Sequence, residues 1–320
     1  MKSAIIGLGV IGKVHYEVLK AQGEEIVALC DTDFEKVREY EGIKKYFDYK
    51  NMLDNEEIDV VHVCTPHYLH AKMVIYALER NINVLCEKPL CISLDEMDEI
   101  LAAEEKSKAK LGVCFQNRYN NSSIFAKDYL KDKKVEYAFG SVRWHRDRAY
   151  YESADWRGRW LTEGGGVLMN QAIHTLDLLV WILGEPKKVV GATFNRLLKG
   201  VIDVEDTACA DYLGDNPFTL FATTSAPKDM PIELRFLTKN ETIVVTPDSV
   251  KINGTPVDLE SENKWYGKLS YGGGHAKLIK DFYDSVARGE RFQIDGKEGA
   301  KAVRQVIATY ISEGKVVDVR

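Results

Sequence analysis

Ala4-Ile5-Ile6-Gly7-Leu8-Gly9-Val10-Ile11-Gly12 decides the fold of the first part of the chain. The apolar start predicts a short strand, and apolar residues recur with helical spacing after the last glycine. Three glycines between a strand and a helix form the G-x-G-x-x-G fingerprint, in which they allow a tight turn and the close approach of a pyrophosphate. The N-terminus of the helix favours the negative charge of that group. We therefore predict that Gly7, Gly9, Val10, Ile11 and Gly12 bind a dinucleotide.

An acidic residue stands where a dinucleotide-binding fold uses one. The next predicted strand, 26–30, ends at Asp31, about 20 residues after the last glycine, where a carboxylate bonds the ribose hydroxyls of adenosine. A carboxylate repels the 2′-phosphate of NADP and no arginine follows directly, so NAD is favoured over NADP. The alternative is that Asp31 caps the helix predicted from Asp33.

Strands and helices alternate through the first third of the chain, which predicts a parallel, doubly wound sheet. Ligands bind beyond the carboxyl ends of such strands. Two strand ends carry distinctive residues, namely Thr65-Pro66 with His70, and Glu87-Lys88-Pro89. We expect these residues to line the cofactor site, with Lys88 held by the adjacent proline so that it points at the nicotinamide. A solvated surface lysine is the common alternative.

A second glycine-rich stretch, Gly164-Gly165-Gly166, runs into a helix whose apolar residues recur at helical spacing. Without Cβ atoms this helix entrance lets a flat ligand approach, and the N–H groups of the first turn can face it. Asn170, His174 and Asp177 lie near one face of the helix because they are four and three residues apart. The alternative is a tight loop followed by a buried core histidine.

Composition limits the class of protein. A chain of 320 residues is long enough for two domains, and 45% hydrophobic with 29% charged residues is typical of a soluble globular protein. The net charge of −6 and the interspersed charges argue against nucleic acid or a membrane surface as partner. No apolar run approaches ~20 residues and the chain starts without a signal-peptide pattern, so we expect a cytoplasmic protein. The six cysteines form no Cys-x-x-Cys pair and no Cys/His group with zinc spacing, which predicts neither disulfides nor a structural metal.

Taken in order, these motifs resemble the Gfo/Idh/MocA oxidoreductases, the family of glucose–fructose oxidoreductase and inositol dehydrogenases. The resemblance covers essentially the whole length. It implies an α/β N-terminal Rossmann domain over residues 1–118. It also implies an α+β C-terminal domain over residues 119–320, built on a large, mostly antiparallel open sheet. This domain is expected to bind the substrate and to mediate assembly into homodimers or homotetramers. The implied activity is NAD(P)-dependent oxidation or reduction at a carbon of a sugar, cyclitol or nucleotide sugar.

The resemblance assigns Lys88 and His174 as the catalytic pair. The chain departs from many family members at Asn170, where they have aspartate. An amide cannot take a proton, but it can bond substrate hydroxyls or Lys88. The pattern of the glycine helix is also similar to the branch of the family that oxidises nucleotide-linked N-acetyl sugars.

Further substrate candidates come from the second part of the chain. Arg118 is expected near the cleft, with a surface role as the alternative. In the loop 150–160, which is rich in aromatic residues and arginines, Trp156 and Arg159 are candidates for contacts with a sugar ring and its polar groups. The alternative is that the tryptophans pack under the glycine helix. Trp265-Tyr266 and 271–275 form a second aromatic and glycine cluster.

We expect His174 to take the hydroxyl proton during oxidation, since imidazole has a pKa near ~6.5 and acts as a base at neutral pH. Lys88 is expected to stabilise the developing negative charge on the same oxygen, although the reverse assignment stays open. Asp177 either holds the imidazole tautomer or is a core-bonded acid. Two other functions stay open: a regulator that binds NAD and sugar without turnover, and a glycosidase that oxidises its substrate transiently.

Overall fold

A computed structural model of the chain describes residues 1–260, 266 and 273–319. The chain divides into two compact units. The first consists of Met1–Gln116 with Lys264–Ala300, and the second of Asn117–Asn263 with Lys301–Arg320. This division differs from the single boundary expected after residue 118, because a late segment of the chain returns to the first unit. In the predicted aromatic cluster, Trp265 and Tyr271 lie outside the described residues.

The first unit is built on a six-stranded sheet in the order β3-β2-β1-β4-β5-β6, in which every neighbouring pair is parallel. Residues of β4 are buried throughout, as expected of a strand covered on both faces. The predicted parallel, doubly wound sheet is confirmed. The strands are β1 (Lys2–Ile6), β2 (Glu25–Cys30), β3 (Lys44–Tyr46), β4 (Val60–Val63), β5 (Asn83–Cys86) and β6 (Leu111–Val113).

Helices connect these strands, and several begin or end at residues that satisfy the free backbone groups. Asp48 accepts hydrogen bonds from Lys50 N and Asn51 N at the start of α3. Ser93 accepts one from Glu96 N at the start of α5. The helices are α1 (Val10–Gln22), α2 (Glu35–Arg38), α3 (Tyr49–Asn55), η1 (His67–Leu69), α4 (His70–Leu78) and α5 (Leu94–Lys106), followed by η2 (Gln116–Tyr119).

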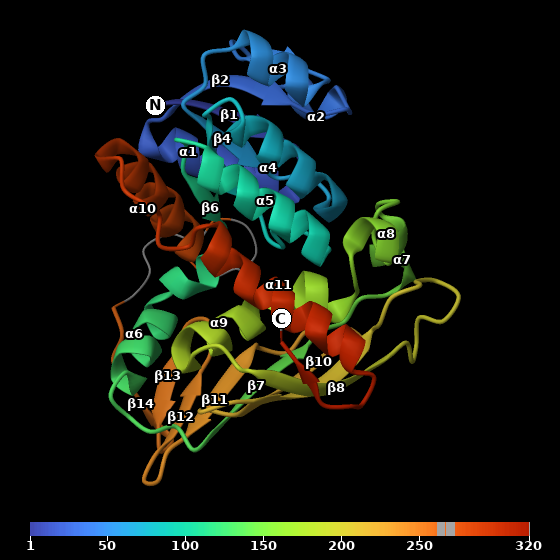
Figure 1. The fold of residues 1–320 in the computed structure, drawn as a ribbon, viewed down its shortest axis with the longest axis vertical. Helices are drawn as coiled ribbons and strands as arrows, with labels where there is room; N and C mark the ends of the chain where they lie inside the picture. The colour runs from blue at the N-terminus through green and yellow to red at the C-terminus, as the bar shows by residue number, and fades with distance from the viewer. Residues whose placement is uncertain (261–265, 267–272, 320) are drawn as a thin grey trace. The chain divides into compact units, whose positions relative to one another are not determined.

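Helix α10 (Gly274–Arg288) completes the first unit although it comes late in the sequence. It lies beside α1, as Figure 1 shows. A Cβ atom on Gly112 would lie 2.7 Å from the ring of Phe282, so glycine is required for β6 and α10 to approach this closely. The hydroxyls of Ser3 and Tyr283 are 2.8 Å apart, which joins β1 to α10 by a buried hydrogen bond.

The second unit is built on a nine-stranded sheet in the order β14-β13-β12-β11-β7-β10-β9-β8-β15. Only the pair β7 and β10 is parallel among the neighbouring strands of this sheet, so the predicted mostly antiparallel sheet is confirmed. The strands are β7 (Tyr137–Arg143), β8 (Lys188–Phe194), β9 (Thr207–Leu213), β10 (Phe218–Thr223), β11 (Glu233–Leu237), β12 (Thr242–Val245), β13 (Val250–Ile252), β14 (Thr255–Pro256) and β15 (Val317–Asp318).

Helices α6 (Asn121–Leu130) and α9 (Ile173–Leu183) lie over this sheet (Figure 1). Gly140 of β7 allows Leu179 of α9 to pack against the strand, since a Cβ atom there would lie 2.8 Å from the leucine side chain. The π-helical turn η3 (Leu168–Ala172) leads into α9. The remaining helices are α7 (Arg148–Glu152), α8 (Trp160–Glu163) and α11 (Gly296–Ser312), which starts in the first unit.

One helical stretch, Trp160–Leu183, is long and apolar enough by composition to cross a membrane. However, 78% of its most apolar window is buried inside the protein. Its apolar side chains therefore form part of the core of the second unit.

Candidate functional site

The glycine loop between β1 and α1 forms the tight turn that its sequence predicts. Gly7 has a φ of +91°, and a Cβ atom there would lie 2.6 Å from the carbonyl oxygen of Cys64. A Cβ atom on Gly12 would lie 1.9 Å from the carbonyl oxygen of Gly7. At Gly9, in contrast, no heavy atom of the described residues lies within 4 Å of the Cβ position, apart from the glycine itself and its chain neighbours. The loop is thus closed on its inner side and open at the N-terminus of α1, where an anionic group can bind.

Asp31 is bound to this loop. Its Oδ2 accepts a hydrogen bond of 2.8 Å from Leu8 N, and its Oδ1 accepts one of 2.9 Å from Asp33 N. Lys36 Nζ lies 3.5 Å from Oδ1. The bond from Asp33 resembles the capping alternative, but α2 begins only at residue 35. The carboxylate therefore joins the end of β2 to the glycine loop and keeps further acceptor capacity for a ribose.

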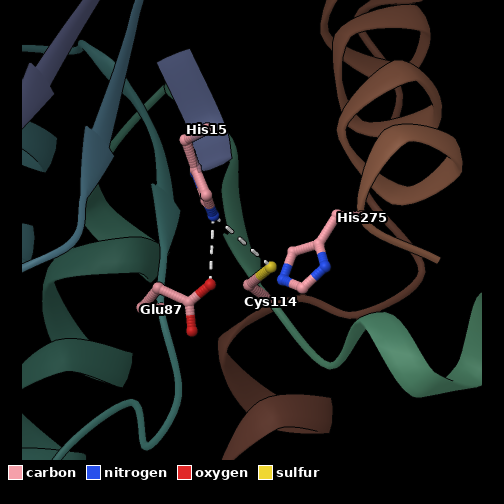
Figure 2. A group of neighbouring side chains, drawn as sticks. All are labelled: His15, Glu87, Cys114 and His275. Atoms are coloured by element: carbon pink, nitrogen blue, oxygen red, sulfur yellow. Dashed lines mark hydrogen bonds and ion pairs between the residues drawn. The ribbon is translucent and has the colours of Figure 1, made fainter. Parts of the chain in front are cut away.

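Glu87, which follows β5, is buried and lies beside His15 (Figure 2). Its Oε1 lies 3.0 Å from Nε2 of His15, and its Oε2 accepts a hydrogen bond of 3.2 Å from Lys88 N. Burial alone raises the pKa of Glu87, but the hydrogen bond and charge of His15, with smaller effects of His275 and Lys88, hold it well below its usual range. Glu87 is thus a buried anion that holds the backbone of Lys88.

His70, at the start of α4, is also buried. Its Nδ1 lies 2.7 Å from the carbonyl oxygen of Pro89, and its Nε2 lies 2.8 Å from that of Thr65. Burial lowers the pKa of His70, and the two carbonyl groups oppose that shift. His70 therefore joins the loop after β4 to the loop after β5. We expected His70 and Glu87 to bind the cofactor, and the structure places both where they hold the backbone beside Thr65, Pro66 and Lys88.

The second glycine motif has a different role from the one expected. Glu205 accepts hydrogen bonds of 2.8 Å from Gly166 N and 2.9 Å from Leu168 N. A Cβ atom on Gly166 would lie 1.8 Å from the carbonyl oxygen of Glu205, and one on Gly165 would lie 2.0 Å from the hydroxyl of Tyr310. The expectation that these N–H groups face a ligand is therefore wrong, because a carboxylate of the same unit binds them and the glycines allow its approach.

Asn170 forms a hydrogen bond with a buried acid that the sequence analysis missed. Its Nδ2 donates to Oε1 of Glu163 at 2.5 Å, and the same carboxyl group accepts from Gly158 N. Burial raises the pKa of Glu163 to about 7, although both hydrogen bonds oppose the shift. The amide at position 170 thus lies beside a carboxyl group that titrates near neutral pH. The position of Glu163, directly before three glycines, was the available signal.

Arg118 and Asp177 are paired with each other. Arg118 Nε donates to Asp177 Oδ2 at 2.8 Å, and Nη2 donates to Oδ1 at 2.6 Å. Their side chains are only 4% and 1% exposed. Asp177 therefore matches the core-bonded alternative, and this ion pair accounts for the main polar groups of two residues that we expected to contact substrate. His174, one turn earlier in α9, is half-buried.

The loop 150–160 is held by contacts within the second unit. Arg159 Nη1 donates to Asp203 Oδ1 at 2.6 Å, and both side chains are about half exposed. Trp160 Nε1 donates to the carbonyl oxygen of Asp203, and its ring meets that of Tyr310 edge to face. Trp156 is half-buried. Trp156, Arg159 and Trp160 thus all retain exposed surface, and Trp160, which is 43% exposed, is not buried as the packing alternative predicts.

The predicted catalytic residues belong to different units. Lys88 is part of the first unit, with the glycine loop and Asp31, and His174 and Asn170 are part of the second.

The chain matches two sequence models of one family. Residues 1–115 match the model described as an oxidoreductase family with an NAD-binding Rossmann fold, and residues 135–244 match the GFO/IDH/MocA C-terminal domain. Inositol 2-dehydrogenase of Salmonella paratyphi B is 27% identical over 214 residues, which are 64% of this chain and 61% of that enzyme. This match thus spans about three fifths of that relative. An uncharacterised oxidoreductase of Bacillus subtilis, YrbE, is 28% identical over 94% of this chain and 91% of its own.

Among solved structures, the fold is similar to the WlbA dehydrogenase of Chromobacterium violaceum in complex with NADH and UDP-GlcNAcA. The TM-score is 0.87 and the sequences are 26% identical, and the match covers 100% of this chain and 96% of the other.

Proposed function

Because the chain belongs to the Gfo/Idh/MocA oxidoreductase family, we propose that it transfers a hydride between the nicotinamide of NAD and a carbon of a sugar, cyclitol or nucleotide-sugar substrate. The observation that carries this proposal is the glycine loop, closed on its inner side by Gly7 and Gly12, open at Gly9, and bonded to Asp31. Such a loop binds a pyrophosphate at the helix N-terminus and a ribose at the acid.

The proposed reaction uses one group from each unit. His174 takes the hydroxyl proton as the hydride leaves the same carbon, and Lys88 stabilises the negative charge that develops on that oxygen. Glu87 and His70 position Lys88, because Glu87 accepts a hydrogen bond from Lys88 N and His70 bonds the carbonyl oxygen of Pro89. Asn170 hydrogen-bonds a substrate hydroxyl while Glu163 fixes its amide. Trp156 and Arg159 contribute to selectivity for the ring and its polar substituents.

We favour a nucleotide sugar over a free cyclitol as substrate. The WlbA dehydrogenase structure has a TM-score of 0.87, against 0.84 for a solved myo-inositol 2-dehydrogenase of Lactobacillus plantarum, and both are 26% identical and cover 100% of this chain. Inositol dehydrogenases of the family also have an aspartate four residues before the histidine, where this chain has Asn170. A cytoplasmic location and a homodimer or homotetramer belong to the same proposal.

The proposal is tested by the appearance of NADH absorbance with a panel of nucleotide sugars, free sugars and cyclitols, each offered with NAD and with NADP. We expect turnover with NAD and at least one nucleotide sugar. Hydrolysis of a glycoside without net NADH would instead identify a glycosidase. Tight binding of NAD and a sugar without either product would identify a regulator, which the amide at position 170 favours as the second candidate.

Asp31 should set the choice between NAD and NADP. In Asp31→Ser we expect kcat/KM with NAD to fall about 10- to 100-fold, since the acceptor for the ribose hydroxyls and the bond to Leu8 N are lost. Activity with NADP should rise because the carboxylate no longer repels the 2′-phosphate and Lys36 is nearby. Initial rates with both cofactors measure the change. Asp33→Ser is the control. An equal loss of kcat/KM with NAD in that variant would show that Asp31 has no particular role in the choice of cofactor.

Glu163 should make folding stability depend on pH near neutrality. Its pKa is about 7 in the folded chain and near 4.5 when unfolded, so its contribution is fully present below pH 4.5 and is lost as pH rises through 7. Glu163→Gln cannot ionise and should therefore gain stability relative to the native chain by up to about 3 kcal/mol between pH 5 and pH 8. Urea unfolding at both values measures this change. Glu152→Gln, at an exposed carboxylate, should show none.

A further inference from the structure

Four side chains that can ligate a metal come together inside the first unit (Figure 2). His15 comes from α1, Glu87 follows β5, Cys114 follows β6, and His275 is the second residue of α10. All four are buried, and one ligand atom from each lies within 4.8 Å of those of the other three. Donors from four separate segments therefore converge on one small volume.

The donor atoms suit zinc. Zinc in proteins binds imidazole nitrogen, thiolate sulfur and carboxylate oxygen in a tetrahedron with bonds of about 2.0–2.3 Å, which places neighbouring donors about 3–4 Å apart. His15 Nε2 lies 3.0 Å from Glu87 Oε1 and 3.9 Å from Cys114 Sγ. These two separations match edges of such a tetrahedron, and His275 faces the same group of atoms in Figure 2.

Charge balance supports the same conclusion. Buried ionised groups require partners of opposite charge, because the protein interior solvates them poorly. The cluster supplies one carboxyl group and one thiol among its four buried donors. Metal ligands bind in their deprotonated forms, so the two positive charges of a divalent cation would balance one carboxylate and one thiolate. Two neutral imidazoles would complete the set.

A chain of hydrogen bonds behind His15 allows it to act as a ligand. Its Nδ1 lies 2.7 Å from Nδ1 of His62, whose Nε2 lies 2.9 Å from the hydroxyl of Tyr283. That hydroxyl in turn lies 2.8 Å from the hydroxyl of Ser3. Because a hydroxyl can donate or accept, the chain permits the tautomer in which His15 carries its proton on Nδ1 and directs the lone pair of Nε2 at the metal. Metal-bound histidines are commonly held in this way.

We propose that His15, Glu87, Cys114 and His275 bind one zinc ion. On binding, the thiol proton of Cys114 leaves to solvent. The Nε2 proton that His15 donates to Glu87 leaves that nitrogen while Nδ1 takes up one proton, so the imidazole stays neutral and both Nε2 and Glu87 can bond the metal. The ion joins α10 to α1 and to the ends of β5 and β6, so it stabilises the returning segment of the first unit. This inference does not depend on the proposed hydride transfer.

The metal content of the full chain tests the proposal. The protein is purified with its affinity tag removed, because a polyhistidine tag binds zinc, and is dialysed against a weak chelator before elemental analysis by mass spectrometry. We expect about one zinc per chain in the native protein. Cys114→Ser should retain less than about a tenth of that zinc. Cys91→Ser, which alters another buried cysteine of the same unit, is the matched control and should keep the metal.

A native protein that holds less than about a tenth of an equivalent, and takes up no zinc when zinc chloride is added, overturns the proposal. So does a Cys114→Ser variant that retains as much zinc as Cys91→Ser. Circular dichroism verifies that the variants fold. If Cys114→Ser does not fold, His275→Gln provides the same comparison, because it removes a different ligand.

Cobalt provides an independent readout of the thiolate. Protein refilled with cobalt chloride should show a thiolate-to-cobalt charge-transfer band in the native chain and in Cys91→Ser. The charge-transfer band should be absent from the spectrum of Cys114→Ser. In His275→Gln the ligand-field bands of tetrahedral cobalt should change. Identical spectra for the native chain and Cys114→Ser would remove Cys114 from the site.

Discussion

Substitution of His174 by alanine should lower kcat by about 10²- to 10⁴-fold, since the proton of the substrate hydroxyl then has no positioned base. The dissociation constant for NAD should change less than about twofold, because the glycine loop and Asp31 belong to the other unit. Stopped-flow rates of NADH formation and a fluorescence titration with NADH measure the two quantities separately. The expected signature is therefore a loss confined to turnover.

The partner variant Lys88→Met should lose a similar factor, and the double variant should lose little more than either single one if both groups act on the same oxygen. His145→Ala, at an exposed histidine of the second unit, is the control and should keep full turnover. Wild-type turnover in His174→Ala would remove that histidine from the mechanism. Strictly multiplicative losses in the double variant would indicate that the two groups act on separate steps.

The buried ion pair between Arg118 and Asp177 should have the largest effect on stability. Asp177→Ala removes the carboxylate and leaves a guanidinium buried opposite a methyl group, which typically costs about 3–5 kcal/mol. We expect this loss in the free energy of unfolding by urea at neutral pH. The double variant Arg118→Met with Asp177→Leu should recover most of it, because no charge is then buried alone.

The matched control is the exposed pair of Arg148 and Glu152, where Glu152→Gln should cost less than about 0.5 kcal/mol. An Asp177→Ala variant that unfolds like the native chain but turns over slowly would contradict the structural role. Asp177 would then act in the reaction, by holding the tautomer of the His174 imidazole.

Local patterns were sufficient for the parallel sheet of the first unit, although not for the late return of α10 to it. The glycine loop, Asp31 and the strand ends lie within stretches of a few residues, and the order of strands and helices restricts them to one parallel sheet. Residues that follow neighbouring strands of such a sheet meet at one edge. This is why the residues 65–70 and 87–89, linked by His70, could be grouped before the structure was known.

Distant contacts were not accessible in this way. Glu205 binds the N–H groups of the glycine helix from 39 residues away, and Arg118 reaches Asp177 across 59 residues. The proposed zinc ligands span positions 15 to 275 and so have none of the short spacings by which zinc sites are recognised in a sequence. The strands β13 to β15 contain only two or three residues each, too few for an alternating pattern to show.

The return of residues 264–300 to the first unit has a consequence for synthesis of the protein. The ribosome makes the whole intervening segment before α10 emerges, and at about 5–20 residues per second this delay is on the order of ten seconds or more. During that time the side of β6 at Gly112, against which Phe282 later packs, lacks its cover on the nascent chain. Chaperones that bind apolar segments should therefore associate with translation intermediates of this protein and dissociate once α10 is complete.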